Sequence, residues 1–138
     1  MKQKKIANKF NPLSLYVIML TFEDKKPLLK GGITTDVERR LSELRRKNKA
    51  TTAVVVGTCK LANFNSEKVN DKTTKLALTA KYSVAENAML QAITDAGYSR
   101  LKMDNTESEY FELTSDVVEV EFNYTIRTPL TKTIRLRA

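Results

Sequence analysis

The stretch LLKGGITTDVERRL places two glycines a few residues before a pair of arginines. Because glycine carries no Cβ, its backbone can approach a ligand closely and its N–H groups can donate to an anion. An arginine guanidinium presents a fork of donors that matches a phosphate group. Gly31, Gly32 and Arg40 could therefore contact a phosphate. The two glycines could also form only a β-bulge.

The residues after the glycines have the periodicity of a helix. Apolar side chains recur at i, i+4 and i+7 from Val37, and Thr35 with Glu38 fits a capping box. At about 100° per residue, Arg40 lies on the border of this apolar face and Arg39 points nearly the opposite way. Arg40 can therefore sit at the rim of a buried site. A helical pair with Asp36, four residues earlier, is the alternative.

A second helix is expected from Ser83 to Gly97, with Glu86 in its first turn. Glu86 shares a ridge with the apolar residues four and seven positions later, so its carboxylate lies beside the core and needs a partner. Mg²⁺ or Arg40 would serve as that partner. Ser83 and Glu86 also have the spacing of a capping box, which would give Glu86 a purely structural role.

The chain is strongly basic, with 24 Lys and Arg against 16 Asp and Glu and a net charge of +8. This charge favours a polyanionic partner, nucleic acid first, although solubility alone would also account for it. Arg45, Arg46 and Lys47 end the first expected helix, and together with Arg39 they are candidate phosphate contacts. Basic segments over 1–13 and 127–138 suggest an arm and a tail around a domain at 14–126.

Several classes of function are excluded by composition. The chain of 138 residues has no histidine, which excludes Ser-His and Cys-His catalysis, and one cysteine, Cys59, which excludes an intrachain disulfide framework and a structural zinc site. No apolar run approaches the length of a membrane span, and no secretory signal is recognisable. We expect a single cytoplasmic domain with no membrane or disulfide-linked partner. The sequence does not indicate an oligomeric state.

The remaining pattern predicts mainly strands. Residues 14–22 and 28–34 should form a hairpin, and residues 52–61 a third, buried strand. A polar loop should follow it. Residues 117–127 alternate with period two, which favours a strand, although Ser115-Asp116 could begin a helix.

In this order of elements the sequence resembles the GIY-YIG nuclease superfamily. SLYVI stands at the G-x-Y strand, and KGGITTDVERRL stands at Y-I-G with its arginine ten residues on, which is Arg40. SVAENAML supplies the metal-binding glutamate, Glu86, and ESEYFEL resembles an E-W-F segment. The nearest pattern is a divergent, phage-type branch with K-x-G in place of Y-I-G. The resemblance implies an α/β (α+β) fold with a small, mainly antiparallel three-stranded sheet flanked by helices and an extra C-terminal strand or helix.

The resemblance also implies a function. It suggests an endonuclease that hydrolyses phosphodiester bonds of nucleic acid, most readily DNA, with one Mg²⁺ or Mn²⁺ held by Glu86. Arg40 would neutralise the phosphate, and Tyr16 would be the base or would position the water. Lys30 stands where the superfamily has its second tyrosine, and it could tune Tyr16 or contact phosphate. The alternative is a GIY-YIG-fold protein that binds nucleic acid or regulates another protein without catalysis. Glu109 is expected at the surface.

Overall fold

A computed structural model describes residues 13–62, 79–103, 106–112, 118–126 and 128–136. The described elements, in chain order, are β1 (Leu13–Thr21), β2 (Leu28–Thr34), α2 (Val37–Asn48), β3 (Thr52–Ala62), α5 (Ser83–Asp95), β4 (Arg100–Met103), β5 (Thr106–Glu112), β6 (Val118–Thr125) and β7 (Pro129–Leu136). The expected N-terminal arm, polar loop and Ser115-Asp116 lie outside this part of the chain. None of the described helices is long and apolar enough to cross a membrane.

The centre of the fold is the predicted β1–β2 hairpin. β1 pairs antiparallel with β2 on one side and with β3 on the other, and the sheet order is β3-β1-β2-β5-β4. The expected mainly antiparallel α+β fold is therefore confirmed. The three expected strands form one end of a larger sheet, because β5 adds to the free edge of β2 and β4 adds to β5.

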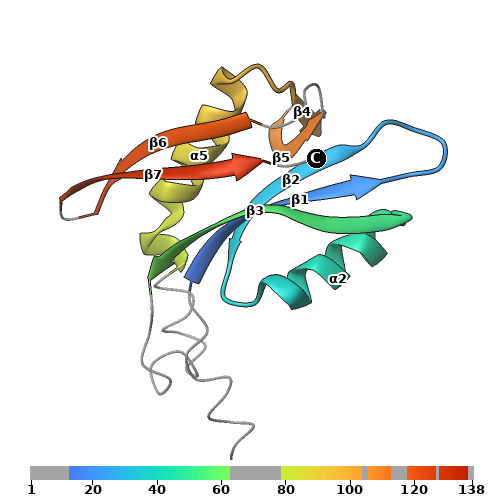
Figure 1. Cartoon of the computed structure of the whole chain (residues 1–138), viewed down its shortest axis with the longest axis horizontal. Helices are drawn as coiled ribbons and strands as arrows, with labels where there is room; N and C mark the ends of the chain where they lie inside the picture. The colour runs from blue at the N-terminus through green and yellow to red at the C-terminus, as the bar shows by residue number, and fades with distance from the viewer. Residues whose placement is uncertain (1–12, 63–78, 104–105, 113–117, 127, 137–138) are drawn as a thin grey trace, which may run out of the picture.

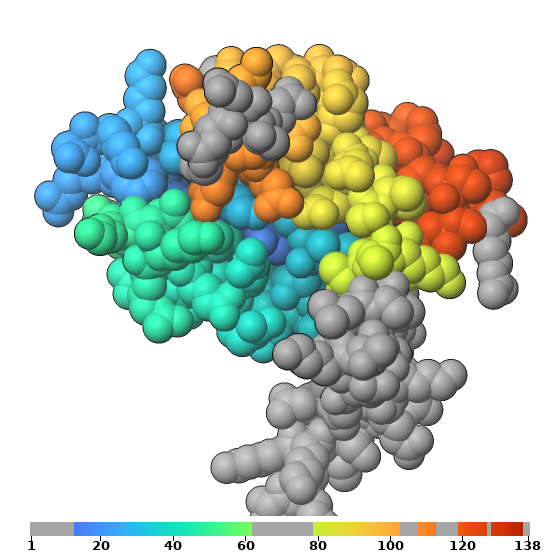
Figure 2. Space-filling view, turned by 180° about the vertical axis from the view of Figure 1, so that it is seen from behind, coloured from blue at the N-terminus to red at the C-terminus, as the bar shows by residue number. Residues whose placement is uncertain are grey.

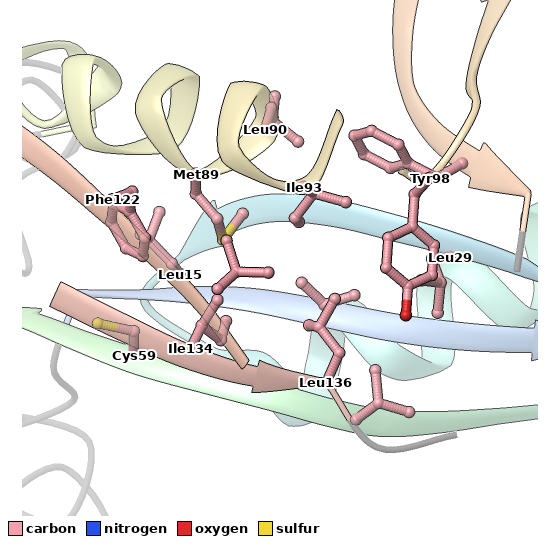
Figure 3. Packing of buried hydrophobic residues seen from close by; sticks show 14 of the residues in the cluster. Leu15, Leu29, Cys59, Met89, Leu90, Ile93, Tyr98, Phe122, Ile134 and Leu136 are labelled. Atoms are coloured by element: carbon pink, nitrogen blue, oxygen red, sulfur yellow. The ribbon is translucent and has the colours of Figure 1, made fainter. Parts of the chain in front are cut away.

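The two faces of the sheet are covered by different elements. Leu15 and Val17 of β1 point into a core formed with α5 and the β6–β7 hairpin, while Tyr16 and Ile18 point into a second core on the α2 side. This is the alternation that a strand imposes on successive side chains. Figure 1 shows α2 on one side of the sheet and α5 with the hairpin on the other. Figure 3 shows the α5 side, where apolar residues of the helix approach the strands.

The C-terminal segment is a strand, not the expected tail. Pro129–Leu136 form β7, which pairs along its whole length with β6, so the ambiguous stretch before residue 126 is a strand as well. Ile134 and Leu136 are buried, and β7 lies directly over β3 at Gly57. A Cβ at Gly57 would lie 2.6 Å from the Arg135 carbonyl oxygen. The hairpin is therefore an integral part of the core.

Both predicted capping boxes are wrong. Helix α2 is capped by Asp36, whose side chain accepts from the Arg39 backbone N–H, rather than by Thr35. Helix α5 has Tyr82 at its N-cap with no side-chain cap hydrogen bond, and the Ser83 hydroxyl donates to the Ala80 carbonyl instead. The carboxylate of Glu86 is thus not used in capping α5.

Candidate active site

Tyr16 lies flat across the neighbouring strand at Gly32. The two residues are direct partners in the regular β1–β2 register, so the glycines do not form a bulge. A Cβ at Gly32 would lie 2.3 Å from the Tyr16 hydroxyl oxygen, which no side chain could tolerate without displacing the ring. Gly32 is therefore needed because it leaves room for a buried tyrosine on the α2 side of the sheet.

Arg40 reaches this tyrosine from α2. Its Nε donates to the Tyr16 hydroxyl at 3.2 Å and its Nη1 donates to Glu43 Oε1 at 3.1 Å. Burial alone would lower the pKa of the guanidinium, but these hydrogen bonds outweigh it and raise the pKa above its ordinary value. The side chain is 38% exposed, so it can still contact a ligand. The alternative side-chain pair with Asp36 is not formed, since Asp36 contacts Arg39 instead.

Lys30 is a buried cation held by a carboxylate. Its side chain is 5% exposed, and Nζ donates to Glu109 Oε1 at 2.5 Å and to the Gly31 carbonyl at 2.7 Å. The ammonium also lies 5.7 Å from the centre of the Tyr16 ring. A buried ammonium needs such partners. Lys30 therefore fixes the position of Glu109 at the point where the β2–β5 ladder ends.

Glu86 and Glu109 form a carboxyl pair across the gap between α5 and β5. Burial is the main cause that raises the pKa of Glu86 from 4.5 to about 7, and the charge and hydrogen bond of Glu109 add to it. Burial acts on Glu109 in the same direction, but its hydrogen bond and ion pair with Lys30 outweigh this and lower its pKa. The proton of the pair therefore resides on Glu86, as expected for two close carboxylates.

These residues interact in a connected set, and the elements that carry them border one recess of the surface. Figure 2 shows a hollow bordered by α2, α5 and β4–β5, in which the blue and cyan atoms of β1 and β2 are visible. Tyr16 and Lys30 come from the floor strands, Arg40 from α2, Glu86 from α5 and Glu109 from β5. Lys30 and Arg40 thus place two cations near the acidic pair.

The carboxyl pair fits a hard divalent cation. Mg²⁺ prefers oxygen ligands, and it commonly keeps several waters while using only one or two carboxylates. Within the described ranges, no group of three or more Cys, Asp or Glu residues is arranged to hold a metal. Glu86 and Glu109 are thus a minimal donor set, and a cation between them would replace the shared proton.

Comparison with known families assigns most of the chain to one domain family. A family model described as the T5orf172 domain matches residues 14–124. The chain belongs to the T5orf172 domain family. No curated protein sequence and no solved structure matches the chain in the same comparisons. Membership in the T5orf172 family supports a nuclease-like or DNA-binding function and a nucleic-acid partner.

The T5orf172 match contains the whole recess, from Tyr16 to Glu109. Of the residues that the sequence suggested, the structure brings together Tyr16, Lys30, Arg40 and Glu86.

The two glycines are buried. A Cβ on Gly31 would lie 2.8 Å from Leu90 of α5, while the Tyr16 ring covers Gly32. Each glycine allows close packing, and the phosphate contact expected of them finds no support in this arrangement.

The other basic candidates lie outside the recess. Arg39 is 59% exposed and pairs with Glu43, and Arg45 lines a separate pocket beside Lys49. Arg46 and Lys47 are exposed on the last turn of α2. They remain candidate contacts for the flanks of a long ligand, whereas Arg40 alone among these basic residues of α2 reaches Tyr16.

Glu109 is a residue of the recess whose contacts sequence reasoning did not indicate. We expected it at the surface, and its side chain on β5 is 43% exposed, but it also contacts Lys30 and Glu86. One feature of the sequence indicated that a carboxylate should lie near Lys30. A lysine one residue before Gly31 in a buried strand requires a nearby carboxylate. The sequence contains many carboxylates, and only the β2–β5 pairing selects this one.

Proposed function

We propose that this T5orf172 protein is a divalent-metal-dependent endonuclease of the GIY-YIG type, acting on phosphodiester bonds of nucleic acid, DNA first. The observation that carries the proposal is the convergence of Arg40, Lys30 and the Glu86–Glu109 pair around one open recess. A phosphodiester requires a cation for its charge and a means to activate water. The recess offers residues for both.

Glu86 and Glu109 would hold Mg²⁺ or Mn²⁺. When bound, such an ion stabilises charge on the phosphate and lowers the pKa of its water. Lys30 orients Glu109 through the 2.5 Å ion pair. Because Glu86 holds a proton up to about pH 7, that proton must leave before a metal binds, so metal affinity should rise as the pH increases through 7.

Arg40 is the residue that would contact the scissile phosphate. Its guanidinium is partly exposed, and its bonds to Tyr16 and Glu43 fix its orientation. Tyr16 is 1% exposed, so it acts through Arg40 as a positioning residue and not directly as the base. This assignment replaces the role of base that the resemblance suggested for Tyr16.

The test is a cleavage assay with plasmid, single-stranded DNA and RNA in Mg²⁺, Mn²⁺ or EDTA. Cleavage should require metal and should be lost in Glu86→Gln and in Arg40→Ala. Arg39→Ala is the matched control, because it removes the same charge from the same helix outside the recess; at saturating DNA, where a flanking contact no longer limits binding, it should cleave at the wild-type rate. Cleavage in EDTA, or cleavage that survives Glu86→Gln, contradicts the proposal.

A second candidate function is a nucleic-acid-binding protein without catalysis. The observation in its favour is the ammonium of Lys30, which lies 2.5 Å from one of the two carboxylates that a metal would need. In a protein without catalysis, the ammonium of Lys30 would take the place of the metal beside Glu109. Salt-sensitive DNA binding of equal affinity in Mg²⁺ and in EDTA, with all three substrates intact, would favour this candidate over the nuclease.

A further inference from the structure

A second surface pocket lies between the end of β3, the start of α5 and the turn of the β6–β7 hairpin. Its volume is about 370 Å³. Its lining includes Leu61, Lys81, Tyr82, Tyr124, Leu130 and Lys132. Figure 1 shows that these segments come together at the end of the molecule away from the β1–β2 turn. The pocket is separate from the recess that contains Arg40.

The lining combines positive charge with aromatic and apolar surface. Among the described residues that line it, the ionisable side chains are two lysines and two tyrosines, with no carboxylate. Leu130 is 41% exposed, which is unusual for a large apolar residue of this domain. By contrast, the larger pocket of about 460 Å³ beside Arg45 is lined by both acidic and basic residues. Of these two pockets, only the one at the start of α5 selects for an anion.

A polar group in this lining lacks a partner. Tyr124 is 5% exposed, and its hydroxyl has no hydrogen bond within the described part of the chain. Burial is the main cause that raises the pKa of this hydroxyl, so it remains a neutral donor. Buried hydroxyls are nearly always hydrogen-bonded in folded proteins. A ligand with an acceptor near the base of the pocket would provide the missing partner.

We propose that this pocket binds one nucleotide of a nucleic-acid strand, with its phosphate on Lys81 and Lys132 and its base against Tyr82 and Leu130. Lysines beside an aromatic platform are the usual means of holding single strands without reading their sequence. The proposal rests on the nucleic-acid binding argued above and adds a second contact to it.

The position of the pocket favours a strand over a free nucleotide. Tyr82 directly precedes α5 and Glu86 lies four residues later. Four helical residues span about 6 Å, which is comparable with one or two nucleotides at about 3.4 Å per step. A strand held in the pocket can therefore continue past the start of α5 to the Glu86–Glu109 pair, so the pocket would align the strand for cleavage.

The experiment measures binding of a single-stranded oligonucleotide by fluorescence anisotropy, in EDTA and at several salt concentrations. All proteins carry Glu86→Gln so that the strand stays intact. Lys81→Ala with Lys132→Ala removes the contact with one phosphate and should lower the slope of log affinity against log salt by about 0.7. Lys25→Ala with Lys26→Ala, at the distant β1–β2 turn, removes the same charge and should leave the slope unchanged.

Two further variants test the base contact. Tyr82→Ala should weaken binding at least about fivefold, which corresponds to loss of a stacked base, while Tyr82→Phe should bind normally. If the pocket variants and the turn variants behave alike while the unmodified pocket binds the strand, the pocket assignment is wrong and the proposed function stands. If neither the oligonucleotide nor a DNA duplex binds even at low salt, both are wrong; if only the duplex binds, the pocket assignment alone is wrong. If a mononucleotide binds as tightly as the oligonucleotide, the occupant is a free nucleotide.

Discussion

Replacing Glu86 by glutamine should stabilise the metal-free protein at pH 8 although it removes the proposed activity. In the folded protein the pKa of Glu86 is raised to about 7 from 4.5, chiefly by burial and then by the charge of Glu109. The folded state therefore binds a proton that the unfolded state has lost between these two pH values. It follows that the stability contributed by this group is complete below about pH 4.5 and falls as the pH rises to 7.

The size of the effect follows from the same pKa. If the pKa of Glu86 rises from 4.5 to about 7 on folding, the free energy of unfolding at pH 8 is lower by about 3 kcal/mol, at about 1.4 kcal/mol per pKa unit. The carboxyl group is partly open to solvent, which screens its charge, so we expect about 1 to 2 kcal/mol. Glutamine at position 86 carries no charge and can donate to Glu109 at any pH.

The assay is urea unfolding in EDTA at pH 5 and at pH 8. The unfolding free energies of the wild type and Glu86→Gln should nearly agree at pH 5, where the wild-type folded state is protonated. At pH 8 the variant should be more stable by about 1 to 2 kcal/mol. Glu121→Gln, on the exposed side of β6, is the control and should show no such pH dependence.

Two results would refute this reasoning. One is a difference between wild type and Glu86→Gln that is the same at pH 5 and pH 8. The other is a variant less stable than the wild type at pH 8, because it would mean that the ionised carboxylate is favourably paired in the folded protein. Mg²⁺ supplies an independent check, since it should stabilise the wild type and not the variant.

Three further substitutions test the packing and geometry of the site. Gly32→Ala places a Cβ 2.3 Å from the Tyr16 hydroxyl; we expect a loss of about 1 to 3 kcal/mol in urea unfolding, together with weaker cleavage as Arg40 loses its hydrogen bond. Arg40→Lys keeps the charge but not the fork, so cleavage should fall about tenfold or more with little change in Tm. Gly57→Ala places a Cβ 2.6 Å from the Arg135 carbonyl oxygen and should destabilise the protein by about 1 to 3 kcal/mol, with faster hydrogen exchange in β7.

The elements that the sequence predicted well are those in which apolar residues form a continuous run or recur at a regular spacing. The β1–β2 hairpin, β3 and α2 begin and end within one or two residues of expectation, because continuous apolar runs and the helical spacing of apolar residues are local signals. Arg40 could be placed at a buried rim from helical geometry alone, and its contact with Tyr16 agrees. Glu86 could be placed beside the core in the same way.

The features that sequence did not predict depend on contacts between distant segments. β7 was missed because its charged residues resemble a solvated tail, yet Ile134 and Leu136 alternate with them and are buried. The capping boxes failed because Asp36 and Tyr82 compete for the cap positions, and the local pattern does not rank them. The role of Glu109 depends on the β2–β5 ladder, which no local signal specifies.

The arrangement of charge in the recess also bears on the choice between the two candidate functions. Lys30 neutralises Glu109 through one short ion pair, whereas the charges of Lys30 and Arg100 offset only part of what burial and Glu109 do to the pKa of Glu86. A site selected for stability alone would gain from an uncharged residue at position 86, since the acidic group is costly there. A carboxyl group retained at such a cost is typical of functional sites, where a ligand provides the missing partner. A divalent cation could be this partner for Glu86 and would leave the ion pair between Lys30 and Glu109 intact. The ammonium of Lys30 is therefore compatible with catalysis.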